Sequence, residues 1–264
     1  MFATINSLKI HYEISGKKEG TAPWVTLSHS LASSMAMWRP QLEMLEKSFC
    51  VLRYDTRGHG GTQTTESPYS LEQLANDIHG LLLHLKIQKT HWIGLSLGGM
   101  IGQSLAIHHP HCLDKVVIAN SNSQVPPAGV VMWNERAESA KQSGMQPLVA
   151  PTLARWFTDP FHKSHPQVLN EIGDIIASTN PTGYAGCCAA ISKMNNIEGL
   201  KKLSHPALIL VGLEDMATPV AMSQIIHENW QGSILKTISH AAHLSNIEQP
   251  SAFNELVETF LKNA

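Results

Sequence analysis

The pentapeptide Gly94-Leu95-Ser96-Leu97-Gly98 constrains the fold more than any other stretch of this chain. A β-prone run, Thr90-His91-Trp92-Ile93, precedes it, and apolar residues at helical spacing follow it until Pro110. This order predicts a strand, a sharp turn and a helix, with the hydroxyl of Ser96 exposed at the turn. The flanking glycines suit such a turn because they have no Cβ atom to clash. Ser96 is therefore the candidate nucleophile, and the candidate chemistry is acyl transfer.

The composition is that of one large globular domain. The chain has 264 residues and is 43% hydrophobic, which suffices for a buried core without disulfides or metals. Its formal net charge of -2 provides no basic field for nucleic acid or an anionic membrane, so we expect a small-molecule partner. The segment from Met1 to His11 lacks a signal-peptide pattern, and no apolar run approaches about 18 residues. We expect a cytoplasmic protein, whose oligomeric state the sequence leaves open.

The cysteines and histidines do not suggest a metal site. The four cysteines are irregularly spaced, and the adjacent Cys187 and Cys188 suit neither a disulfide nor a zinc motif, so reduced thiols are expected. Histidine-rich segments occur at 108–111 and 240–243. The first lies at a helix end, where an imidazolium complements the helix dipole, and no cysteine or carboxylate stands near it at a ligand spacing. We predict no metal and no cofactor.

Alternating strands and helices predict an α/β fold with a doubly wound, mostly parallel sheet. Two antiparallel strands are expected between Phe2 and Ser15, because residues 9–14 alternate between polar and apolar. The expected strands of the parallel sheet are 24–27, 50–54, 90–93, 115–119, 207–211 and 234–238. The expected helices include 41–47, 71–85, 220–229 and 251–262, and Ser70 with Gln73 forms a capping box before the second.

Residues 123–203 interrupt this alternation. No buried strand is predicted there, and repeated prolines break the helical periodicity. We expect an inserted helical cap on a core formed by residues 1–122 and 204–264. The large apolar side chains that could form the core of the cap or face Ser96 are Met132, Trp133, Met145, Leu148, Leu153, Trp156 and Phe157.

A serine nucleophile needs a base, and the base needs an acidic partner that fixes its tautomer. Asp215 follows the predicted strand 207–211, at the carboxyl edge of the sheet, where the sites of such folds gather. Its neighbour Glu214 is the competing carboxylate. The spacing Gly212-x-x-Asp215-x-x-x-Pro219 resembles the acid loop of the α/β-hydrolases, which favours Asp215.

His243 is the candidate base. It follows the predicted strand 234–238 and begins the pattern His243-x-x-x-x-Glu248-x-Pro250, which resembles the histidine loop of the α/β-hydrolases. His240 is the alternative, but it lacks this sequel and is interpreted as a solvated turn residue. The chain order of nucleophile, acid and base is the one expected for this fold, and the resemblance covers nearly the whole chain.

The resemblance also implies an oxyanion hole made of two backbone N–H groups. Leu97, directly after the nucleophile, is the first donor. Leu31 is the second, because Ser28-His29-Ser30-Leu31 resembles the family's His-Gly-x segment, with serine in place of the usual glycine. The histidine of this segment is interpreted as a structural brace, and the serine hydroxyl is expected to bond locally. Residues 54–60 look like the family's second signature, whose charged side chains brace loops below the site.

Serine at the turn argues against the dehalogenase and epoxide-hydrolase branches, which place an aspartate there. The chain looks much like the 3-oxoadipate enol-lactonases of aromatic-acid catabolism. The segments that carry this resemblance are 37–40, 52–60, 155–158, 183–185, 188–191 and 243–248. It implies hydrolysis of a small enol-lactone bearing a carboxylate, through an acyl-enzyme on Ser96 and attack by water assisted by His243.

A substrate carboxylate needs a cation in an otherwise apolar pocket. Arg136 and Arg155 of the predicted cap are the candidates, with Trp133 or Trp156 as pocket walls, and we favour Arg136 and Trp133 for substrate binding. Other serine hydrolases on this scaffold remain open: a carboxylesterase, a carbon–carbon bond hydrolase of ring-cleavage products, or a perhydrolase. The remaining alternative is a ligand-binding protein without catalysis.

Overall fold

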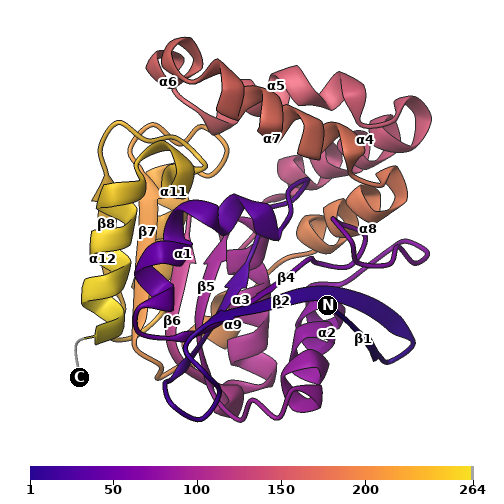
Figure 1. The fold of residues 1–264 in the computed structure, drawn as a ribbon. Coiled ribbons are helices and arrows are strands. Elements are labelled where there is room, and N and C mark those ends of the chain that lie inside the picture. Colours follow the sequence, from indigo (N-terminus) through magenta and orange to yellow (C-terminus); the bar gives the residue numbers. More distant parts are fainter. Residues whose placement is uncertain (263–264) are drawn as a thin grey trace.

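A single sheet organises the computed structural model, which describes residues 1–262. Its eight strands lie in the order β1-β2-β4-β3-β5-β6-β7-β8 (Figure 1). The strands are β1 (Phe2–Ile5), β2 (Leu8–Gly16), β3 (Trp24–Ser28), β4 (Cys50–Tyr54), β5 (Thr90–Leu95), β6 (Leu113–Ala119), β7 (Ala207–Gly212) and β8 (Ile234–Ile238). β2 pairs antiparallel with β1 and β4, and every other pair is parallel. The predicted α/β fold with a mostly parallel sheet is confirmed.

The antiparallel edge is a hairpin. β1 and β2 are joined at Asn6 and Ser7, whose φ angles of 50° and 66° are left-handed. Two-residue hairpin turns of the primed types require this conformation, since it matches the twist of the strands. The hairpin leaves the carboxyl edge of the parallel strands free for loops.

Helices cover both faces of the sheet (Figure 1). The core helices are α1 (Arg39–Glu46), α2 (Leu71–His84), α3 (Leu97–His108), α10 (Val220–Asn229), α11 (Ser245–Glu248) and α12 (Pro250–Lys262), with short 3₁₀ turns η1 (Met35–Trp38) and η2 (Pro110–Cys112). α1 packs against α12 on one face, and α2 packs against α3 on the other. The apolar residues of α2 at helical spacing are buried, and the Ser70 hydroxyl accepts the backbone N–H of Gln73 at 3.0 Å, as the capping box predicts.

The segment between β6 and β7 is helical. Its helices are α4 (Pro127–Ser143), α5 (Val149–Trp156), α6 (Asp159–Ser164), α7 (Pro166–Ser178), α8 (Pro181–Ser192) and α9 (Ile197–Leu200), with the 3₁₀ turn η3 (Gln146–Leu148). α4 to α7 lie above one edge of the sheet in Figure 1, whereas α9 packs against α3 and α10. The strand pairing recorded for this segment is one isolated bridge, between Gln124 and Asn195. We propose that α4 to α8 form the cap predicted within residues 123–203.

The large side chains of the cap divide between core and cavity. The buried ones are Met145, Trp156 and Phe157, those packed against the core are Trp133, Leu148 and Leu153, and the exposed one is Met132. Both Trp133 and Trp156 also line a cavity of about 390 Å³. Two tryptophans of the proposed cap therefore form part of the cavity wall.

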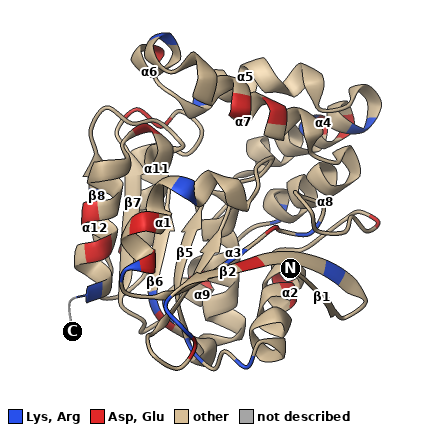
Figure 2. Ribbon diagram, in the orientation of Figure 1, with Lys and Arg blue, Asp and Glu red and all other residues tan. Residues whose placement is uncertain are grey.

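The surface and the thiols offer few other features. Lys and Arg are interspersed with Asp and Glu along the ribbon in Figure 2. All four cysteines are buried and free. Within residues 1–262, no helix is long and apolar enough to cross a membrane, and no group of three or more metal-binding side chains is found. The cytoplasmic location stays a prediction.

Candidate active site

Ser96 occupies a strained turn between β5 and α3. Its φ of 55° and ψ of -115° lie in a region that residues with a side chain rarely adopt. The backbone N–H of Ser96 donates to the carbonyl of Ala119 at 2.9 Å, which holds the turn against β6. A Cβ atom added at Gly94 would lie 2.1 Å from the carbonyl oxygen of Gly98, and one added at Gly98 would lie 2.0 Å from that of Ser28. The two glycines are therefore required by close packing, while the strain falls on Ser96.

Asp215 accepts five hydrogen bonds in the loop after β7. Its Oδ1 accepts the backbone N–H groups of Ala217 and Thr218, both at 2.8 Å. Its Oδ2 accepts the Thr218 hydroxyl at 2.7 Å, Nδ2 of Asn120 at 2.9 Å and Nδ1 of His243 at 2.9 Å. Burial raises the pKa of this carboxyl, but His243 and the other donors outweigh it and hold the pKa below its usual range. The carboxylate is therefore ionised at neutral pH.

His243 is oriented by this carboxylate. Because Oδ2 of Asp215 is an acceptor, the bond assigns the proton to Nδ1 of His243 and leaves Nε2 free to accept one. The Trp156 ring packs against the imidazole with 6.1 Å between centroids. The competing residues named from the sequence, Glu214 and His240, are both exposed to solvent.

Ser96 and His243 line one cavity of about 390 Å³. Its walls come from the core and from the cap, and include Leu31, Met100, Val125, Trp133, Arg136, Arg155, Trp156 and Tyr184. Such a cavity, mostly apolar with a few converging polar groups, is typical of a small-molecule site. The arrangement can activate a serine hydroxyl beside a bound acyl compound.

The two predicted oxyanion donors have different surroundings. Leu31 lines the cavity, whereas Leu97 is fully buried as the first residue of α3 and is not among the cavity residues. Backbone N–H groups in the first turn of a helix have no partner within the helix. The hydroxyl of Ser30 was expected to bond locally, but it has no hydrogen-bond partner among the described residues. The left-handed residue of this loop is Ala32, with φ of 55°, so position 30 does not require glycine.

Two buried histidines hold the loop after β3. His29 accepts the backbone N–H of Thr56 with Nε2 at 2.9 Å and donates from Nδ1 to the carbonyl of Ser30 at 2.7 Å. His59 accepts the backbone N–H of Ala32 with Nε2 at 3.0 Å. Burial lowers the pKa of both rings, to about 3 for His59, so both are neutral and can accept these bonds. His29 is a brace, as predicted, and His59 is a second one.

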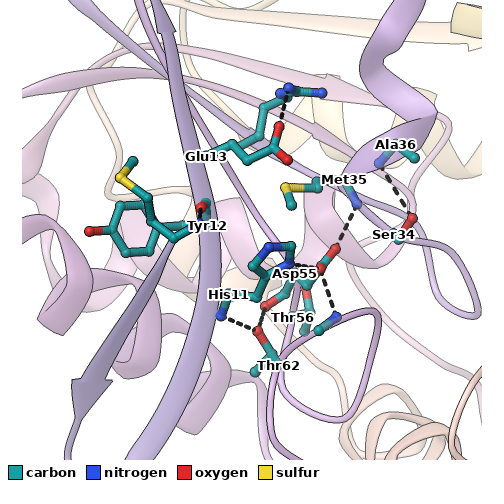
Figure 3. Close-up of polar contacts among 12 residues, drawn as sticks. His11, Tyr12, Glu13, Ser34, Met35, Ala36, Asp55, Thr56 and Thr62 are labelled. Atoms are coloured by element: carbon teal, nitrogen blue, oxygen red, sulfur yellow. Dashed lines mark hydrogen bonds and ion pairs between the residues drawn. The ribbon is translucent and has the colours of Figure 1, made fainter.

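Asp55, directly after β4, fixes the same loop (Figure 3). Its Oδ1 accepts the backbone N–H of Met35 at 2.8 Å, while Oδ2 accepts the N–H of Gly61 at 2.9 Å and Nδ1–H of His11 at 2.8 Å. Arg57 instead forms a buried, bidentate pair with Asp77. Both charged residues of the 54–60 signature thus brace loops, as the sequence predicts.

The protein is expected to lose stability in acid because of His59. In the folded protein this ring resists protonation down to a pKa of about 3, whereas in the unfolded chain it takes up a proton near the ordinary 6.5. The contribution of His59 to the free energy of unfolding is complete above pH 6.5 and falls as the pH drops, by about 2 kcal/mol between pH 7 and pH 5. Urea unfolding at both pH values measures this, and His59→Gln, which keeps an acceptor for Ala32, should show a smaller pH dependence by that amount. Equal pH dependence in the two proteins would contradict it.

Asn120 is a site residue that no motif indicated. It follows β6, and its Nδ2 donates to Oδ2 of Asp215 and to the carbonyl of Ala242 at 3.1 Å. Its Oδ1 accepts the Ser245 hydroxyl at 2.5 Å. Asn120 therefore links the acid loop to the histidine loop. The sequence signal for it is the polar run 120–123 directly after a buried strand.

The cap contributes two arginines to the cavity. The Cζ of Arg136 lies 4.8 Å from the centroid of the Trp133 ring. Burial, together with the nearby charge of Arg136, lowers the pKa of Arg155. Within residues 1–262, the arginines that form ion pairs are Arg53 and Arg57. Arg136 and Arg155 both line the cavity, and neither forms an ion pair within the described residues, which suits an anionic ligand.

This fold and this site define an α/β-hydrolase. The family model described as alpha/beta hydrolase fold matches residues 23–250, and the chain belongs to that family.

The chain is 34% identical, over 98% of its length and 95% of the relative's, to 3-oxoadipate enol-lactonase 2 of Acinetobacter baylyi. It superposes on the crystal structure of the enol-lactonase from Burkholderia xenovorans LB400 with a TM-score of 0.96 and 37% identity over both full lengths. A putative carbamate hydrolase RutD of Agrobacterium fabrum is 27% identical over 96% of the chain and 98% of the relative. The protein is a hydrolase similar to enol-lactonases.

Proposed function

We propose that this hydrolase opens the lactone ring of 3-oxoadipate enol-lactone to give 3-oxoadipate. The observation that carries the proposal is the pair Arg136 and Arg155, which line the cavity of Ser96 and His243 and form no ion pair with any carboxylate of residues 1–262. A substrate that bears a carboxylate beside its acyl group would bring a negative charge next to these two cations. The similarity to two proteins named as enol-lactonases supports the same substrate.

Ring opening begins when Nε2 of His243 accepts the proton of Ser96 Oγ, and that oxygen attacks the lactone carbonyl carbon. Asp215 stabilises the imidazolium, because its lowered pKa keeps the carboxylate ionised. The N–H groups of Leu31 and Leu97 stabilise the oxyanion, and one such donor typically contributes about 3 kcal/mol to the transition state.

The tetrahedral intermediate then breaks the ring C–O bond. The leaving oxygen takes the proton from His243 and becomes an enol, which stays attached to the acyl chain because the ester was cyclic. The enol tautomerises to a ketone. Water, deprotonated by His243, attacks the acyl-enzyme, and His243 then returns the proton to Ser96 Oγ as the bond between this oxygen and the acyl carbon breaks. The reaction adds one water molecule, transfers no electrons and needs no cofactor.

Turnover of freshly generated enol-lactone, followed by its ultraviolet absorbance, is the direct test. We expect a higher kcat/KM for the lactone than for p-nitrophenyl acetate. Turnover of the acetate alone contradicts the proposal and favours a carboxylesterase. The same preparation assayed with a ring-cleavage diketone, and with acetate plus hydrogen peroxide, tests the carbon–carbon bond hydrolase and perhydrolase alternatives. Ligand binding without any turnover would indicate a binding protein.

Replacing Arg136 with methionine is expected to lower kcat/KM for the lactone at least about 10-fold relative to p-nitrophenyl acetate. A hydrogen bond to a charged group contributes about 1.5–3 kcal/mol. The acetate ester has no carboxylate, so it does not make this bond and cannot be affected by its loss. Arg155→Met in the same assay compares the two cations. Lys141→Met, which removes an exposed charge from α4, is the matched control and should leave the ratio unchanged. Equal losses on both substrates would mean that Arg136 does not recognise the carboxylate.

A further inference from the structure

Glu248 is a buried carboxylate, 6% exposed, that the mechanism above does not use. It ends α11, the short helix that follows the histidine loop. Its Oε1 accepts both the backbone N–H and the hydroxyl of Thr158, at 2.9 and 2.5 Å. Its Oε2 accepts the backbone N–H of Ala242 at 2.7 Å. One carboxylate thus joins the cap, at the N-cap residue of α6, to the residue before His243.

A second contact holds the other side of His243. The backbone N–H of Leu244 donates to the carbonyl oxygen of Trp156 at 3.1 Å. The Trp156 ring lines the cavity and packs against the imidazole. The residues before and after His243 are therefore both tied to one turn of the cap, residues 156–158.

The carboxylate of Glu248 is held by hydrogen-bond donors. Within residues 1–262, the glutamates found in ion pairs are Glu13, Glu43, Glu198 and Glu258. A buried carboxylate without a cation is costly, and an apolar side chain would fill the same space at lower cost. The three hydrogen bonds from Thr158 and Ala242 need an acceptor at this position, which a carboxylate supplies and an apolar side chain would not. The contact joins positions 90 residues apart in the chain.

We infer that Glu248 is a positioning residue that couples the cap to the catalytic base. The inference rests on the proposed role of His243. The cap turn 156–158 contacts the substrate cavity through Trp156, and Glu248 transmits the position of this turn to the backbone that carries the imidazole. A displacement of about 1 Å at a reacting group can lower a rate about 10²-fold. The cap turn that lines the cavity and the backbone that carries the imidazole are thereby held in a fixed relative position.

Glu248→Gln and Thr158→Val test the coupling with p-nitrophenyl acetate as substrate. Each is expected to lower kcat about 10-fold or more while KM stays within about 2-fold, because the base is displaced and the cavity is kept. Thr158→Ser retains the hydroxyl and should restore the parental kcat. The double variant should be no slower than Glu248→Gln alone, since both changes act on the same contact between Thr158 and Glu248. Thr158→Val keeps its backbone N–H bond to Glu248, so it provides the measurement if Glu248→Gln does not fold.

Asp77→Asn is the matched control, because it neutralises another 6% exposed carboxylate, the partner of Arg57. It should lower Tm and leave kcat unchanged. If Glu248→Gln and Thr158→Val behave like Asp77→Asn, or if Thr158→Ser is as slow as Thr158→Val, the inference is overturned. An enzyme that turns over the ester and not the lactone refutes the substrate proposal and leaves the coupling measurable. Parental ester kcat in both variants refutes the coupling alone.

Discussion

Replacing Ser96 with alanine is expected to lower kcat at least about 10⁴-fold, on the lactone and on p-nitrophenyl acetate alike. Removing the nucleophile of a serine hydrolase leaves the rate enhancement that binding and oxyanion stabilisation supply. Single-turnover and steady-state rates measure the loss, and Tm reports whether the fold is intact. Turnover within about 10-fold of the parent protein would remove Ser96 from the mechanism.

Ser96→Gly tests whether the backbone at this position is strained. Serine at φ of 55° and ψ of -115° stores backbone strain, which alanine keeps and glycine relieves. Both variants should be inactive, and the glycine variant should be more stable than the alanine variant by about 1 kcal/mol in urea unfolding. Equal stability of the two variants would mean that the turn is not strained.

Replacing His243 with alanine is expected to lower kcat about 10⁴-fold or more, because no other histidine and no carboxylate of residues 1–262 lines the cavity with Ser96. The ring is buried, with its Nδ1 bonded to Asp215, and it lines the same cavity as the serine. His240→Ala is the matched control. It removes a histidine three positions earlier that is exposed to solvent, and its kcat should match that of the parent.

The two histidine variants are compared in one assay, with Tm measured for each. A large loss in His240→Ala with little loss in His243→Ala would reverse the assignment of the base. Similar losses in both, at unchanged Tm, would show that the loop as a whole matters more than either ring. In both of these cases the mechanism proposed above fails.

Much of the fold follows from local patterns. The strands around Ser96, the apolar stripe of α2 and the capping box at Ser70 all depend on residues close together in sequence, and the structure contains each of them. The Gly-x-Ser-x-Gly pattern is only partly local. A Cβ atom at Gly94 would meet Gly98 of the same turn, whereas one at Gly98 would meet the carbonyl oxygen of Ser28 in β3.

The oxyanion loop was less predictable. The motif indicates where Leu31 lies, but the left-handed residue is Ala32, and the Ser30 hydroxyl has no partner in the part of the chain that the structure describes. The braces of this loop, Asp55 and His59, both come from the loop that follows β4. Nothing within the loop itself specifies these partners.

The sequence by itself determined the strands of the sheet and the turn at Ser96, because hydrophobic periodicity and turn chemistry act over a few residues. The predicted order of Ser96, Asp215 and His243 followed from the resemblance to the α/β-hydrolases. The tertiary structure decided which polar groups meet at the site. Asn120 bonds to Asp215 across 95 positions, and Thr158 bonds to Glu248 across 90. Such pairs form because parallel strands end at one edge of the sheet and the cap folds back over it, and no local pattern encodes that distance.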